Sequence, residues 1–181
     1  MLFRSGLAVH LSSPSGLPTA ARLCYSLLPK GEVMPSENKQ LVRRVFQELW
    51  NYGKLAVADE IFAANYVNHD PASPDFGTGP EGVKQTVTLY RNAFPDLQLS
   101  IDQLIEADQF ITTRFTSRGT HRGELLGIAP TKRTIRVEGI VIHRISRGNI
   151  AEAWVLWDAL GLRQQLGVVP ASEKAKAQAN K

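Results

Sequence analysis

The segment IRVEGIVIHRISRGNIAEAWVLWD, residues 135–158, shows most clearly what kind of domain this chain makes. Apolar and polar side chains alternate with a period of two over residues 135–145 and again over residues 150–158, as in strands with two different faces. The four residues between these runs, Ser146-Arg147-Gly148-Asn149, have the composition of a tight connection. The segment therefore predicts two antiparallel strands joined as a hairpin.

Further strands and three helices are predicted upstream of this hairpin. The alternation appears at residues 97–101 and returns at residues 110–120, on either side of a turn at residues 107–109. Before Pro95 the apolar period changes to 3.6, which predicts helices over residues 36–51, 55–62 and 79–94. Residues 66–71 are expected to be extended, and residues 71–80, rich in Pro, Gly, Ser and Asp, to form a loop.

Helices first and long strands afterwards indicate an α+β domain. We expect a curved antiparallel sheet that wraps round the three N-terminal helices. A short helix over residues 158–166 ends the folded body. A sheet curved in this way encloses a pocket at one end, so the interior of the domain is where a function is expected.

The formal net charge of +4 comes from the two ends of the chain. Residues 1–33 and residues 171–181 each carry a net charge of +2, so residues 34–170 are neutral overall. A basic nucleic-acid-binding face on the folded body therefore has no support, and we expect no nucleic-acid partner. No apolar run approaches the roughly 18 residues of a membrane span, and the single cysteine, Cys24, cannot form an intrachain disulfide.

The composition divides the chain into three parts. Residues 34–170 are expected to form the domain, and residues 171–181 a flexible basic tail. Residues 1–33 are expected to be disordered, and they have three interpretations: an organelle transit peptide, a secretory signal or an upstream extension. The polar break at residues 12–18 argues against a secretory signal, and Met34-Pro35-Ser36-Glu37 has the character of a natural start, which favours an extension. We expect a cytoplasmic protein, or an organelle protein if residues 1–33 are a transit peptide.

Asp158, at the end of the last predicted strand, has two interpretations. Strict alternation puts it on one strand face with Glu152, Trp154 and Leu156. If that face lies inside the fold, apolar neighbours disfavour the charged carboxylate and raise its pKa, which suits a general acid or base. Alternatively, Asp158 caps the helix that follows it, because aspartate is a preferred N-cap residue.

The predicted domain contains three histidines and an arginine in mid-strand. His69, His121 and His143 each have a structural and a catalytic interpretation, and no metal-ligand spacing accompanies them, so we expect no metal. Phosphate-cradle and dinucleotide-binding fingerprints are absent, so we expect no cofactor. Arg114 either pairs inside the fold with a carboxylate such as Glu138 or reaches solvent from the outer face.

Several segments resemble the SnoaL-like polyketide cyclase, or ester cyclase, family of the nuclear-transport-factor-2-like superfamily. They are RGTHRGELLGIAPTKR at residues 118–133, FPDL at residues 94–97 and GNIAEAWVLWD at residues 148–158. With the opening helix and the Asn68-His69-Asp70 motif, the resemblance spans residues 37–167. Two positions depart from the family pattern: Lys132 stands where a glycine is usual, and His143 where an aromatic residue is more common.

The resemblance implies a cone-shaped α+β fold with a deep apolar pocket, often in a homodimer, that works without metal or cofactor. In the family, an acidic residue that closes the last core strand is the general acid/base of an intramolecular aldol ring closure, and Asp158 matches that position. Asp158 is thus expected to be catalytic, with His121, His143 or Arg114 donating a hydrogen bond to the enolate oxygen. The pocket is expected to include Trp154, Asn68, His69, Phe46, Trp50, Tyr90 and Glu138.

The expected function is acid/base cyclisation or isomerisation of a small apolar or aromatic carbonyl compound. Because fold does not fix function, two alternatives stay open. One is a non-catalytic ligand-binding or dimerisation module of the same fold. The other is a hydrolase or dehydratase that uses the same cavity.

Overall fold

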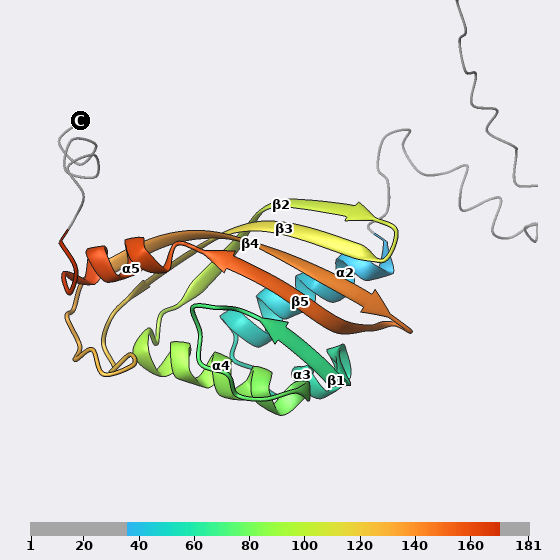
Figure 1. Ribbon diagram of the computed structural model, residues 1–181, viewed down its shortest axis with the longest axis horizontal. Coiled ribbons are helices and arrows are strands. Elements are labelled where there is room, and N and C mark those ends of the chain that lie inside the picture. Colours follow the sequence, from blue (N-terminus) through green and yellow to red (C-terminus); the bar gives the residue numbers. More distant parts are fainter. Residues whose placement is uncertain (1–35, 171–181) are drawn as a thin grey trace, which may run out of the picture. The chain divides into compact units, whose positions relative to one another are not determined.

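A computed structural model describes residues 36–170 of the chain, drawn in colour in Figure 1. The expected extension at residues 1–33 and the expected tail at residues 171–181 lie outside the described residues. In chain order the elements are α2 (Glu37–Arg44), η1 (Val45–Asn51), α3 (Val57–Ile61), β1 (Phe62–His69), α4 (Gly79–Ala93), β2 (Gln98–Ala107), β3 (Phe110–Thr120), β4 (Thr134–Ser146), β5 (Asn149–Trp157) and α5 (Ala159–Leu166).

The predicted helices are present, and the first of them changes type along its length. Helix α2 begins after Ser36, whose hydroxyl oxygen accepts the backbone N–H of Lys39 at 3.2 Å. It continues without a break into η1, a π-helix, so the helix predicted over residues 36–51 is confirmed as α2 plus η1. The π-helix ends under Arg91, whose Nη1 donates to the carbonyl oxygens of Trp50 and Asn51.

The strands form one five-stranded sheet in the order β1-β5-β4-β3-β2. Strands β2 to β5 pair antiparallel with their sequence neighbours, as the alternating patterns predict. The expectation of a wholly antiparallel sheet is wrong at one edge, because β1 pairs parallel to β5. No hairpin turn links these two strands, so no local turn sets their relative direction.

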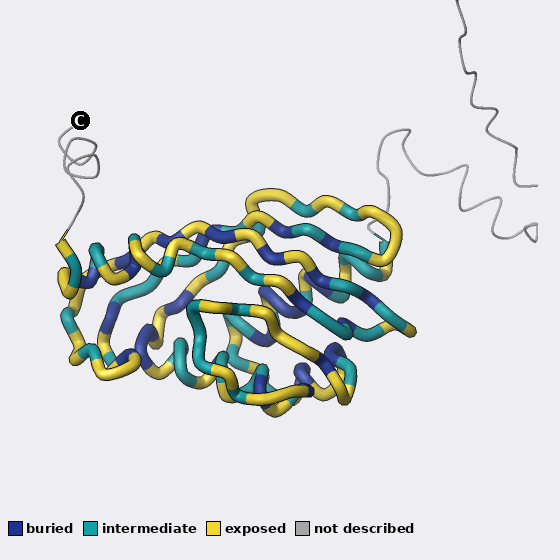
Figure 2. Tube along the Cα trace, viewed as in Figure 1, coloured by how far each residue is buried: buried dark blue, intermediate teal, exposed yellow. Residues whose placement is uncertain are grey.

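The expected α+β fold, with a curved sheet and helices on one side of it, is confirmed. Figure 1 shows α2, α3 and α4 against the same side of the curved sheet. Buried and exposed residues alternate along β4, which reproduces the period of two read from the sequence (Figure 2).

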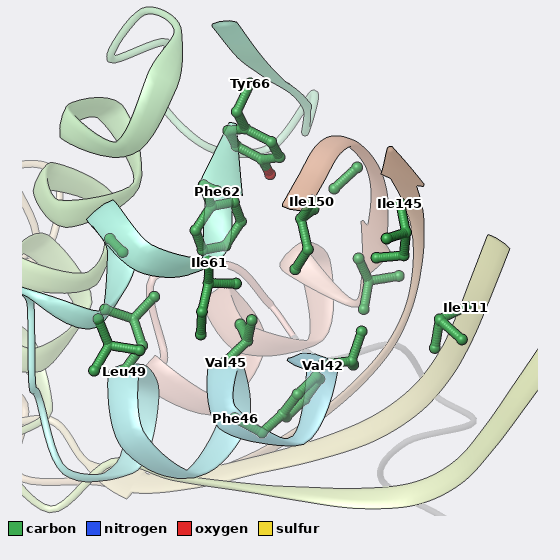
Figure 3. Close-up of a cluster of buried hydrophobic side chains, with 14 of the residues drawn as sticks. Val42, Val45, Phe46, Leu49, Ile61, Phe62, Tyr66, Ile111, Ile145 and Ile150 are labelled. Atoms are coloured by element: carbon green, nitrogen blue, oxygen red, sulfur yellow. The ribbon is translucent and has the colours of Figure 1, made fainter. Parts of the chain in front are cut away.

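The main apolar core lies between the helices and the concave face of the sheet. In Figure 3, Val42 and Val45 of the first helix lie towards the sheet residues Ile145 and Ile150, and Leu49 lies on the other side of Val45 from them. All five side chains are at least 94% buried. Burying such side chains is the main stabilising contribution to the fold, at about 1.5–3 kcal/mol each. This packing fixes the concave face, and the cavity described next opens within it.

Candidate active site

A cavity of about 540 Å³ lies between the helices and the concave face of the sheet. Nine aromatic side chains supply much of its wall: Phe46, Trp50, Phe62, Tyr66, Phe76, Tyr90, Phe94, Phe115 and Trp157. The size and the apolar lining are typical of sites that enclose a small organic molecule. The polar groups that reach this cavity are therefore the candidates for chemistry.

The residues of β5 that face the cavity are Ala153, Val155 and Trp157. This is the opposite set from the one that strict alternation predicts, and a β-bulge is the reason. Ile145 pairs with Ile150, but the neighbouring Arg144 pairs with Glu152, so β5 contains one extra residue at Ala151. An extra residue shifts the phase of a strand by one and sends every later side chain to the other face.

Asp158 and Trp154 therefore do not line the cavity, and their expected positions in the pocket are corrected. Asp158 is exposed, and its carboxylate accepts the N–H of Gly161 at 2.7 Å as the N-cap of α5. Trp154 is 38% exposed on the outer face, where its ring stacks on His69 with centroids 5.2 Å apart. Of the two interpretations of Asp158, the structure shows the one in which it caps the helix that follows.

Arg114 and Glu138 both lie on the exposed outer face, so the expected place of Glu138 in the pocket is wrong and Arg114 takes the outer-face position that was one of its two interpretations. The Arg114 guanidinium is 3.9 Å from Asp102 and 4.0 Å from Glu138, with half of its side chain in solvent. Glu138 makes its shorter ion pair with Arg136, at 2.6 Å. Neither residue lines the cavity, since both occupy outward-facing positions on β3 and β4.

His121 is buried but lies outside the cavity lining. Its Nδ1 accepts the backbone N–H of Thr131 at 3.1 Å, and its ring packs on Phe94 with centroids 5.2 Å apart. Burial lowers the pKa of its imidazole, which favours the neutral form that this hydrogen bond needs. His121 therefore holds the loop between β3 and β4 in place. It was expected to help catalysis from the pocket, but it does not line the cavity.

The cavity does bring together six of the residues singled out from the sequence: Phe46, Trp50, Asn68, His69, Tyr90 and His143. His69 reaches only its edge, because its Nε2 pairs with Glu152 at 2.8 Å, on the strand face that points away from the cavity. Asn68, the residue before it on β1, also lines the cavity, and its Oδ1 accepts the hydroxyl proton of Tyr66 at 3.3 Å.

His143 is the histidine that faces the cavity from within the sheet. Only 4% of the residue is exposed, and burial lowers the pKa of its imidazole to about 4. Its Nδ1 has no hydrogen-bond partner among residues 36–170. The ring is consequently neutral near pH 7, and its Nδ1 is a buried polar atom without a partner in that part of the chain.

Asp70 is a carboxylate in the cavity wall that was expected only as part of the Asn68-His69-Asp70 motif and not as a catalytic or pocket residue. Its Oδ1 accepts the N–H of Ala72 at 2.9 Å, and its Oδ2 accepts the Ser73 hydroxyl at 2.7 Å. The indole N–H of Trp157 lies 3.1 Å from Oδ2 and 3.3 Å from Oδ1. The sequence signal that could have found it is its place before Pro71, where a strand enters a long polar loop, because functional side chains concentrate on such loops.

Two further observations bear on cofactors and membranes. Across residues 36–170, no group of three or more His, Cys, Asp or Glu side chains is arranged to hold a metal ion. In the same part of the chain, no helix is long and apolar enough to cross a membrane.

Comparison with known proteins identifies relatives over most of the described chain. A family model described as SnoaL-like polyketide cyclase matches residues 40–166. Nogalonic acid methyl ester cyclase of Streptomyces nogalater is 30% identical over 121 residues, which cover 65% of this chain and 89% of that protein. Aklanonic acid methyl ester cyclase DnrD of Streptomyces peucetius is 31% identical over 133 residues, covering 70% and 88%. The solved structure of TsrD from Streptomyces laurentii is similar with a TM-score of 0.68 at 28% identity, over 76% of this chain and 100% of that one.

Proposed function

Because the chain belongs to the SnoaL-like polyketide cyclase family, we propose that it closes a ring in a small apolar carbonyl compound by cofactor-free acid/base catalysis. The reaction takes place in the cavity of about 540 Å³. Trp50, Tyr90 and Trp157 provide flat aromatic walls there, which suit a planar ring system. The two cyclases with which this chain shares about 30% identity act, by their names, on methyl esters of nogalonic and aklanonic acid.

The observation that carries the proposal is that a carboxylate, Asp70, and a neutral imidazole, His143, both line one apolar cavity. Asp70 removes a proton from a carbon flanked by carbonyl groups, a step that the conjugation of the substrate makes easier. His143 donates a hydrogen bond to the resulting enolate oxygen. A fixed donor in an apolar cavity stabilises developing negative charge better than water does.

The experiment is a turnover assay with the two methyl esters named above. Purified protein is incubated with each ester, and the product, which has the mass of the substrate because ring closure is an isomerisation, is separated by liquid chromatography. We expect turnover of at least one ester above the rate without protein. Quenching of tryptophan fluorescence by 9,10-anthraquinone, combined with no turnover of either ester, would instead support a non-catalytic binding module and contradict the proposal.

A homodimer that uses the outer face of the sheet is the second part of the proposal. Ile140 and Leu156 pair across β4 and β5, next to the pair of Ile142 and Trp154. These four side chains are 37–70% exposed and form one apolar strip. A contiguous apolar strip of this kind is typical of an interaction surface, whereas single exposed apolar side chains are not. Charges of both signs border it, as in Arg114 and Glu138, so a second copy related by a two-fold axis meets complementary charge.

The dimer is tested by placing a charge in the strip. Leu156→Asp is expected to convert the protein from dimer to monomer in size-exclusion chromatography with light scattering, because the carboxylate would be buried without a partner. Leu126→Asp is the matched control, since Leu126 is 49% exposed but lies in the loop between β3 and β4. If light scattering finds the wild-type protein to be a monomer at a concentration of tens of micromolar, the dimer proposal is contradicted.

A further inference from the structure

The hydrogen bonds around Asp70 have directions that the chemistry of the groups fixes. An ionised carboxylate only accepts hydrogen bonds, so the Ser73 hydroxyl donates its single proton to Oδ2 of Asp70, at 2.7 Å. The Ser73 oxygen is also 3.0 Å from the hydroxyl oxygen of Tyr90. Since the Ser73 proton is already engaged, Tyr90 donates to Ser73. The three side chains thus form a directed chain from Tyr90 through Ser73 to Asp70.

The carboxylate at the end of this chain is held in place by other donors. Trp157 Nε1–H contacts both of its oxygens, and the backbone N–H of Ala72 donates to Oδ1. These donors come from β5 and from the loop after β1, two parts of the chain that are far apart in sequence. Asp70 therefore keeps its position relative to Ser73 when its charge changes.

The other end of the chain, the Tyr90 hydroxyl, belongs to a side chain of the cavity wall. The Tyr90 ring lies between two tryptophans, 6.1 Å from Trp50 and 6.2 Å from Trp157 between centroids. Burial and the charge of Asp70 raise the pKa of its phenol, so the group keeps its proton near neutral pH. Tyr90 is thus a proton donor that faces the place where the substrate would bind.

We propose that Tyr90 and Ser73 are a proton relay, which returns to the product oxygen the proton that Asp70 takes from the substrate carbon. The inference rests on the proposed cyclase function. In ring closure, the substrate C–H bond breaks, Asp70 takes the proton, and the carbon forms a new bond to a carbonyl carbon. The carbonyl oxygen becomes an alkoxide, and this oxygen needs a proton to complete the reaction.

The relay completes the cycle because the hydrogen bonds reverse when Asp70 is protonated. Protonated Asp70 becomes a donor to Ser73, and the hydroxyls of Ser73 and Tyr90 rotate so that the Tyr90 proton faces the cavity. Tyr90 then gives its proton to the alkoxide, takes one from Ser73, and Ser73 takes one from Asp70. Three O–H bonds break and three form, and Asp70 ends as a carboxylate. Tyr90 is then a catalytic residue, and Ser73 acts through its two neighbours.

The test separates the first proton transfer from the last. With either methyl ester as substrate, Tyr90→Phe and Ser73→Ala are each expected to lower kcat for ring closure about 100-fold, with KM changed less than about threefold. In deuterium oxide, both variants are still expected to exchange the acidic carbon-bound proton of the recovered substrate at the wild-type rate, because Asp70 is intact. Ring closure and exchange are followed in the same samples by chromatography and mass spectrometry.

Matched controls and a third variant separate the possible failures. Tyr52→Phe and Ser100→Ala remove the same hydroxyl groups at exposed positions outside the cavity and are expected to leave both rates unchanged. If Tyr90→Phe loses exchange together with ring closure, Tyr90 serves binding or structure, and the relay is overturned. If Asp70→Asn abolishes both rates while Tyr90→Phe and Ser73→Ala lower neither, the relay is overturned and the cyclase function stands. If Asp70→Asn keeps both rates, the assignment of the base fails, and the relay fails with it.

Discussion

Replacing Asp70 by asparagine is expected to lower kcat for ring closure by about 100- to 10,000-fold, the range that general acid/base catalysis supplies. The amide has nearly the shape of the carboxylate and keeps one oxygen that can accept hydrogen bonds from Trp157 and Ala72. It cannot accept a proton from a carbon acid. The measurement is steady-state kinetics with the methyl esters, accompanied by circular dichroism to verify that the variant is folded.

Asp158→Asn is the decisive comparison for Asp70→Asn. Asp158 is the residue that the family resemblance singles out, but its carboxylate caps α5 and does not line the cavity. Asparagine is about as good an N-cap as aspartate, so the substitution is expected to change kcat by less than about twofold and stability by a few tenths of a kcal/mol. A large loss of activity at Asp158 with none at Asp70 would reverse this assignment and restore the one that the sequence favours.

The free energy of unfolding is expected to fall by up to about 3 kcal/mol between pH 7 and pH 4 because of His143 alone. Burial lowers the pKa of its imidazole from the usual 6.5 to about 4 in the folded protein. Between pH 6.5 and about pH 4, the His143 imidazole binds a proton in the unfolded chain and does not bind one in the folded chain. The contribution is therefore fully present above pH 6.5 and is lost as the pH falls towards 4. Urea unfolding curves at several pH values measure it.

A variant without His143 isolates this contribution from that of the carboxylates. His143→Leu removes the buried titratable group and is expected to show a smaller loss of stability over the same pH range than the wild type. His69→Gln is the matched control, because the His69 side chain is 43% exposed and its surface pair with Glu152 is worth at most about 1 kcal/mol. An unchanged pH dependence in His143→Leu would show that His143 is not buried in the neutral form.

The sequence predicts the secondary structure well because its signals are local. The 3.6-residue period before Pro95 and the period of two after it follow from the geometry of helices and strands. Antiparallel neighbours were predictable for the same reason, since turns such as residues 146–149 set the direction of adjacent strands. The parallel pairing of β1 with β5 was not, because it joins strands separated by about half of the chain.

The sequence predicted part of the candidate site. The prediction failed on β5, because the inward and outward positions of that strand are reversed after its bulge. His143 reaches the cavity by regular alternation along β4, whose inner residues follow one another without interruption. On β5 the extra residue Ala151 reverses the alternation, so Trp157 faces inward where Asp158 was expected. A bulge leaves no clear mark in a sequence of Ala, Glu and Ala, because it depends on how the neighbouring strand pairs.

By itself, the sequence determined the helices, the strands, the neutral charge of the folded body and the resemblance to a family of cyclases. Only the tertiary structure decided that Asp70, and not Asp158, lines the cavity. The physical reason is that Asp70 has its position through partners from distant parts of the chain: Trp157 on β5, and Tyr90 on α4 through Ser73. Local patterns report which face of an element is apolar. Which polar groups meet across that face depends on how the elements pack together.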